Sequence, residues 1–159
     1  MTKVLLSLHV LAAILAVGSI TVAASMFPRY ALQASASGGQ DPDARAASIA
    51  ALLHKICRGY AVAGLAVPVF GLATAAALGV LTDAWLIASL ALTVIAAAIL
   101  AMAILPGQQR LLALIQGSPT QDGPRAAATR LTMLTGIFNV IWTIVVILMI
   151  VRPGSTTGA

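Results

Sequence analysis

Charged residues make up only 8% of this 159-residue sequence, and the acidic ones are four aspartates with no glutamate. A soluble domain of this length carries charge on about a quarter of its residues, which lets it cover its surface. The scarcity of charge therefore excludes a soluble globular protein. Hydrophobic residues supply 60% of the chain instead.

Cysteine, aromatic residues and catalytic motifs are also scarce. The single cysteine, Cys57, excludes an intramolecular disulfide and a Cys-x-x-Cys metal site. Aromatic residues make up 4% and do not alternate with a basic stripe, so the net charge of +5 does not indicate nucleic-acid binding. There is no Ser-His-Asp set, H-E-x-x-H motif or phosphate-binding loop. We therefore expect no enzyme and infer no soluble substrate.

The hydrophobic residues lie in four long uninterrupted blocks, a pattern typical of transmembrane helices and not of alternating strands. The first block, Val4–Met26, has 23 residues. A helix of that length crosses a hydrocarbon core of about 30 Å at about 1.5 Å per residue. The block exceeds the roughly 7–15 residues of a signal-peptide core, so we expect a retained anchor. The predicted spans are about 4–26, 59–81, 84–105 and 131–151.

These spans predict an all-α membrane protein, a single antiparallel four-helix bundle that takes up residues 1–159. Pro28 is expected to end the first helix, because proline removes a backbone donor. A polar loop is expected at 33–44, followed by a helix that Asp43 caps. The second span contains Pro68.

The link between the second and third spans is Thr82-Asp83, so short that these spans must form an antiparallel hairpin. Asp83 suits the start of the third helix, where a carboxylate is favoured. Pro106 and Gly107 are expected to close that span, with 108–116 as a surface segment.

Basic residues predict the orientation of the bundle. Four spans place both termini on one side of the membrane, together with Lys3 and Arg152. The positive-inside rule predicts that the side with more basic residues is cytoplasmic, so both termini are outside in a multi-pass protein of the bacterial inner (plasma) membrane. The other seven basic residues are on the opposite side, which holds the two longer links between spans: Arg29, Arg45, Lys55, Arg58, Arg110, Arg125 and Arg130.

Polar side chains in or beside the spans are candidate functional positions, since such groups are costly in a membrane. They are His9, His54, Arg58 and Asn139. Packing inside the bundle is the simplest interpretation for His9. Asn139 is expected to bond a neighbouring hydroxyl or backbone group, with contact to a lipid or quinone as the alternative. His54, Lys55 and Arg58 are expected at the membrane surface, against anionic headgroups or an acidic partner.

Haem and copper are the two cofactors that the histidine, methionine and cysteine side chains of this sequence suggest. His9 and His54 are expected about 25–30 Å apart along the membrane normal by helix rise, too far to ligate one iron. Methionine in a membrane helix is usually packing material, and no Met-x-x-Met or His-x-His spacing occurs. We therefore expect no cofactor and no catalytic or metal site, with metal or haem handling as the alternative function. The soft side chains that favour copper on the cytoplasmic side are Met26, His54, Cys57, Met102 and Met133.

Two stretches carry a family resemblance. Leu8–Ala13 (LHVLAA), with Gly18, is similar to the first helix of small bacterial membrane proteins related to the copper-resistance D family. Gly136–Trp142 (GIFNVIW) and Met149–Gly154 (MIVRPG) resemble the last helix of an uncharacterised four-helix family found in actinobacteria among others. Of the copper-family positions, His9 is the one that maps onto this chain.

Small four-helix proteins of this kind also occur as accessory subunits at the edge of actinobacterial respiratory supercomplexes. The resemblance implies a non-catalytic structural subunit of a cytochrome bcc–aa3-type assembly in electron transport. Its partners are then other integral membrane subunits and lipids.

Overall fold

The computed structural model describes residues 2–36, 41–117 and 123–154, and every regular element in those ranges is helical. The elements are α1 (Thr2–Ala36), α2 (Asp41–Ala63), α3 (Ala66–Leu78), α4 (Ala84–Ile99), the π-helix η1 (Leu100–Ile104), α5 (Leu105–Ile115) and α6 (Pro124–Val151).

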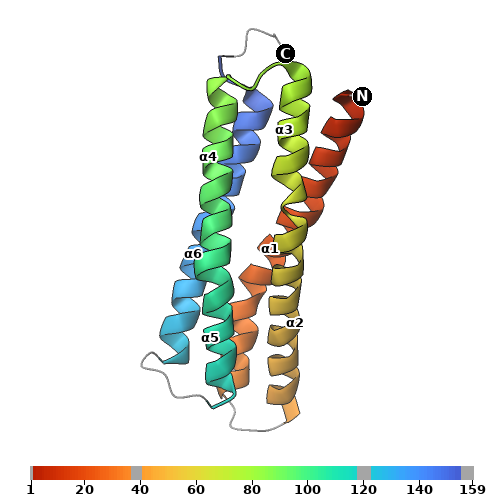
Figure 1. Cartoon of the computed structure of the whole chain (residues 1–159). Coiled ribbons are helices and arrows are strands. Elements are labelled where there is room, and N and C mark those ends of the chain that lie inside the picture. Colours follow the sequence, from red (N-terminus) through yellow and green to blue (C-terminus); the bar gives the residue numbers. More distant parts are fainter. Residues whose placement is uncertain (1, 37–40, 118–122, 155–159) are drawn as a thin grey trace.

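Four rods in the described residues are long and apolar enough to cross a membrane: α1, α2 with α3, α4 with η1 and α5, and α6. They run antiparallel, with both ends of the chain at one end of the bundle (Figure 1). The predicted all-α fold with four membrane-spanning helices is confirmed.

The first rod is longer than its hydrophobic block. The prediction that Pro28 ends the helix is wrong, because α1 continues to Ala36. Pro28 faces the bundle interior between Phe27 and Ala31, which are both 0% exposed, so packing holds the helix together past the missing donor. The next helix begins at Asp41, so Asp43 lies inside α2 and does not cap it. Of the expected loop at 33–44, residues 37–40 lie outside the described part.

The second rod is interrupted near Pro68. Because Pro68 has no N–H, the carbonyl of Gly64 lacks its usual partner four residues on, and it accepts instead from Val67 N at 3.0 Å. The helix breaks there, between the end of α2 and the start of α3. The expected turn at Thr82-Asp83 is confirmed: α3 ends at the left-handed Gly79 (φ 72°), and Asp83 precedes α4.

The third rod also passes through a proline. The prediction that Pro106 and Gly107 close it is wrong. The wider π-turn η1 lies just ahead of Pro106 and accommodates its missing donor. The helix continues to Ile115, so most of the expected surface segment 108–116 is helix. A Cβ added at Gly107 would lie 2.8 Å from Leu131 Cδ2, which shows how closely α5 approaches α6.

The fourth rod starts earlier than the predicted span at 131. Helix α6 begins at Pro124, in the first-turn position that proline favours. It ends at Val151 and is followed by Arg152, which has a left-handed conformation with φ 45°.

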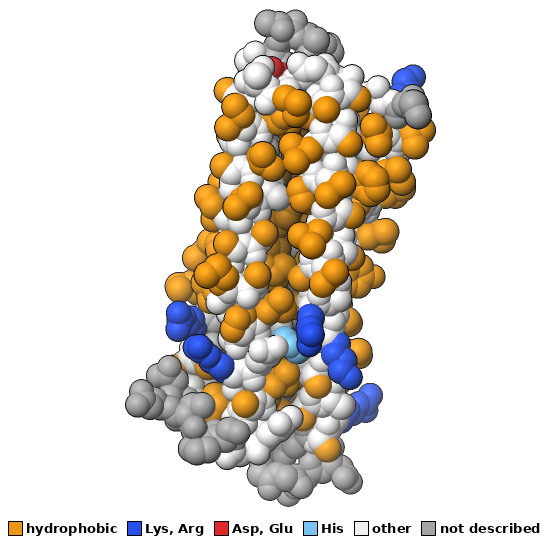
Figure 2. Space-filling model, viewed as in Figure 1, with side chains coloured by type: hydrophobic (Ala, Val, Ile, Leu, Met, Phe, Trp, Pro, Cys, Tyr) orange, Lys and Arg blue, Asp and Glu red, His pale blue; other side chains and the backbone are white. Residues whose placement is uncertain are grey.

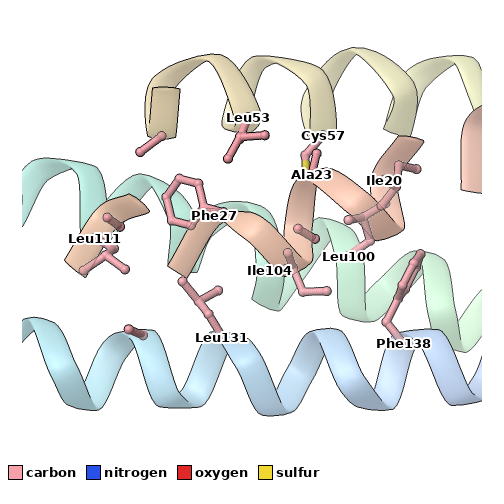
Figure 3. Close-up of a cluster of buried hydrophobic side chains, with 14 of the residues drawn as sticks. Ile20, Ala23, Phe27, Leu53, Cys57, Leu100, Ile104, Leu111, Leu131 and Phe138 are labelled. Carbon is pink, nitrogen blue, oxygen red and sulfur yellow. The ribbon is translucent and has the colours of Figure 1, made fainter. Parts of the chain in front are cut away.

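The main hydrophobic core surrounds the second half of α1. Phe27 and Ala23 of α1 face α2, α5 and α6 (Figure 3). This core lies toward the end of the bundle opposite the chain termini, where α1 is followed by α2 and α5 by α6 (Figure 1). We call this end the loop end, and the half of the bundle next to it the loop half. Its larger fully buried side chains are Phe27, Ile104, Leu111 and Phe138.

Candidate functional site

His9 lies in the half of the bundle that holds the chain termini, and its imidazole is buried against α3. Its Nδ1 donates a hydrogen bond to the backbone carbonyl oxygen of Val67, at 2.8 Å. A carbonyl oxygen only accepts, so Nδ1 carries a proton, and in the neutral tautomer with this proton Nε2 is a hydrogen-bond acceptor. Gly71 makes room for the ring, since a Cβ there would lie 2.9 Å from His9 Cε1.

His9 also borders an apolar cavity of about 350 Å³ between α1, α3, α4 and α6. Apart from His9, the indole nitrogen of Trp142 and the hydroxyl of Thr93, the lining side chains are apolar. The Thr93 hydroxyl is already used, since it donates to the carbonyl oxygen of Ser89 at 2.8 Å. The cavity therefore offers an apolar volume with His9 at its wall.

A second polar cluster lies inside the loop half of the bundle. His54 Nδ1 donates to Gln108 Oε1 at 2.9 Å, and Gln108 Nε2 donates to Cys57 Sγ at 3.6 Å. Gln108 is 1% exposed and Cys57 0%. The expectation that the His54 side chain faces headgroups or an acidic partner is therefore wrong: its ring points inward and joins α2 to α5.

Asn139 makes the interhelical bond expected of it. Its Oδ1 accepts a hydrogen bond at 3.1 Å from the hydroxyl of Thr21 on α1. Its backbone carbonyl accepts from Thr143 at 2.9 Å. This side chain thus joins α6 to α1 in the middle of both helices.

The basic side chains gather outside the bundle, near its loop end (Figure 2). Lys55 and Arg58, which both follow the inward-facing His54 along α2, are exposed. Arg58 is thus on the outside of the bundle, and its place at the membrane surface stays a prediction. At the opposite end, the Arg152 guanidinium lies 5.6 Å from the ring centre of Trp85, whose indole N–H donates to Asp83 at 2.9 Å.

The two histidines do not meet. His9 bonds Val67, which follows His54 by 13 residues along the second rod. At about 1.5 Å per residue, this separates the two imidazoles by about 20 Å along the bundle, too far to share one iron. In the described residues no group of three His, Cys, Asp or Glu side chains has a geometry for metal binding.

The soft side chains considered for copper are divided between the inside and the outside of the bundle. His54 and Cys57 are buried, whereas the three methionines are exposed on its outer surface. The structure therefore brings two of the five together, through Gln108. The exposed methionines are Met26, Met102 and Met133.

Several residues of these sites escape the sequence reasoning. Gln108 follows Pro106 and reads as loop, and the inward turn of its side chain depends on η1. The carbonyl of Val67 and the space at Gly71 are backbone features. Pro68 gives a partial signal, since a proline inside a span marks locally altered backbone bonding.

Residues 3–153 match the family model described as predicted integral membrane protein, DUF2269. None of the curated proteins and none of the solved structures gives a significant match. The family match confirms the expected integral membrane protein and covers nearly the whole sequence. The chain therefore belongs to the DUF2269 family of predicted integral membrane proteins.

Proposed function

We propose that this protein is a non-catalytic membrane subunit that packs against other integral membrane subunits. The observation that carries the proposal is the use made of the polar side chains inside the spans. His9, His54 with Gln108, and Asn139 each bond to another helix of the bundle. Such bonds in lipid hold helices together, which is the role of a rigid structural subunit.

Helix α6 offers a surface for a partner helix. Six of its eight exposed large hydrophobic side chains recur at alternating spacings of four and three residues, which suits the seam of a helix–helix contact. We call this surface the α6 stripe, and it consists of Met133, Ile137, Val140, Ile144, Ile147 and Val151.

The same proposal assigns the loop end of the bundle to the cytoplasm and both termini to the outside. Seven of the nine basic residues belong to the loop end, and all seven are exposed. The positive-inside rule favours this orientation in a bacterial plasma membrane.

The partner is a respiratory assembly of the cytochrome bcc–aa3 type. This part of the proposal is an analogy, supported by the resemblance of the outer spans to small four-helix accessory subunits of actinobacterial supercomplexes. The α6 stripe then lies against a helix at the edge of that assembly.

Purification of the tagged protein from its native membranes in a mild detergent tests the proposal. Mass spectrometry is expected to find cytochrome subunits in a fixed ratio to the chain. A photo-crosslinking residue at Ile144, in the α6 stripe, is expected to capture one of them. The matched control is Val94 on α4, which is expected to capture lipid. Both side chains are exposed, Ile144 at 42% and Val94 at 61%.

Two results would contradict the proposal. One is a protein that purifies alone and captures lipid from both positions. The other is a protein that purifies alone with stoichiometric copper or haem by metal analysis and absorption spectroscopy, which would support metal or haem handling.

A further inference from the structure

The cavity beside His9 differs from the rest of the bundle interior. The loop half has a filled core of large side chains, whereas the half with the termini has an apolar space of about 350 Å³. The side chains around an apolar volume of this size lack packing partners within the bundle, and apolar cavities of about 150 Å³ already bind single-ring molecules. The space therefore suits a guest of one or two rings.

The cavity faces the membrane through the side of the bundle. Helices α1 and α3 pack together, as do α4 and α6, but α3 and α4 are not in extensive contact although a short turn joins them. Leu72 of α3 and Leu90 of α4 line the cavity and are both partly exposed at this opening. Apolar side chains line the seam between these helices (Figure 2). A guest with an apolar tail can thus keep its tail in the lipid.

The wall of the cavity selects the polar group of the guest. His9 Nδ1 is bound to Val67, and Nε2 has no hydrogen-bond partner among the described residues. The neutral ring thus offers an acceptor to a donor on the guest. Trp142 adds an aromatic wall on the α6 side. These groups favour a ring that carries a hydroxyl.

We propose that this cavity binds a lipid-soluble ring compound through a hydroxyl group that donates to His9 Nε2, with its apolar tail leaving between α3 and α4. Phenolic lipids and reduced quinones share this chemistry. The inference is independent of the proposed subunit role, because it concerns a site inside the bundle and not its outer surface.

Fluorescence of Trp142 tests the proposal in the full chain, reconstituted in lipid nanodiscs. The protein has two tryptophans, so Trp85→Phe leaves Trp142 as the reporter. The probes are a brominated naphthol with one prenyl tail and its methyl ether, which has the same ring and tail but no donor. We expect saturable quenching by the naphthol, and weaker binding of the ether by about three- to tenfold, the value of one hydrogen bond.

Two variants locate the site. His9→Leu is expected to lower the affinity for the naphthol to that of the ether. Gly18→Leu is expected to abolish saturable quenching, because Gly18 lines the cavity and has open space where a Cβ would stand. Gly136→Leu is its matched control, since it also has open space but lies away from the cavity.

Any one of three results overturns the proposal. They are quenching that rises linearly with either probe, equal affinity of the native cavity for naphthol and ether, and saturable quenching that survives Gly18→Leu as it survives Gly136→Leu. Thermal melts by circular dichroism confirm that each variant is folded. The Gly18→Leu comparison decides the matter if His9→Leu fails to fold.

Discussion

His9 Nδ1 donates a 2.8 Å hydrogen bond to the carbonyl oxygen of Val67, one turn before the glycine that the same imidazole touches. This pairing ties α1 to α3 beside the cavity. It also fixes the tautomer of the ring, and with it the side of the imidazole that can accept a hydrogen bond.

Gly71→Ala is expected to destabilise the bundle. The new Cβ would lie 2.9 Å from His9 Cε1 and 3.1 Å from Nδ1, so the ring has to move and its bond to Val67 weakens. Overpacking of this kind costs about 1–3 kcal/mol, measured by reversible unfolding in mixed micelles. Gly136→Ala, with no atom within 4 Å of the added carbon, is expected to be neutral or slightly stabilising. Equal effects of the two substitutions would contradict the close contact.

Gln108→Leu is expected to loosen the loop half of the bundle. The substitution leaves His54 Nδ1 without its acceptor, at a cost of about 1–3 kcal/mol for a buried group. It also removes the hydrogen bond that Gln108 Nε2 donates to Cys57 Sγ, so in the loosened core labelling of this thiol by a maleimide should become faster. Gln109→Leu is the control, because this neighbour is exposed. An unreactive Cys57 in the Gln108→Leu protein would argue against the cluster.

Thr21 and Asn139 are expected to be coupled energetically. In a double-mutant cycle of Thr21→Val and Asn139→Leu, the interaction energy should be about 0.6–1.7 kcal/mol, the range of hydrogen bonds between membrane helices. The control cycle pairs Asn139→Leu with Thr74→Val, whose hydroxyl bonds within its own helix. Additive effects in both cycles would contradict the bond.

Thr135→Val is expected to be tolerated or to stabilise the protein by up to about 1 kcal/mol. The hydroxyl of Thr135 is buried without a hydrogen-bond partner in the described residues, so its loss removes an unsatisfied group. Thr74→Val is the comparison, because it removes a buried hydroxyl that bonds Phe70 at 2.7 Å. The unfolding free energy should be higher for Thr135→Val; the reverse order would show that the Thr135 hydroxyl has a partner.

The proposed orientation makes a prediction for labelling in intact cells. In a Cys57→Ala background, Thr82→Cys in the exposed turn should react with a membrane-impermeant maleimide. Gln109→Cys, exposed near the other end, should react only after the cells are opened. The opposite pattern would reverse the orientation.

Hydropathy predicts how many helices cross the membrane, and it predicts the turn at Thr82, because both depend on transfer of side chains into lipid. Helix ends follow different physics. Pro28 and Pro106 read as helix stops, yet packing of Phe27 and the π-turn before Pro106 carry both helices onward. These extensions need contacts between distant segments, so a local pattern does not reveal them.

For the same reason, the sequence predicts the contacts of some candidate site residues and not those of others. The side chain of Asn139 is strongly polar in an apolar span, so its need for a partner is visible in the sequence. His54 comes directly before the exposed Lys55 and close to the exposed Arg58, and its inward direction depends on Gln108 of a distant helix. No sequence pattern predicts the cavity, because it depends on how four helices, α1, α3, α4 and α6, are arranged in space.

The irregular turns of the second and third rods mark one level in the bundle. Gly64 precedes Thr82 by 18 residues and Leu100 follows it by 18, so the break before Pro68 and the start of the π-helix lie at matching heights in the two arms of one hairpin. On the side of these two positions toward the loop end, the arms pack against large buried side chains. On the side toward Thr82, they border the cavity beside His9. Both arms of the hairpin therefore change from regular to irregular helix at the level where the main core gives way to the cavity.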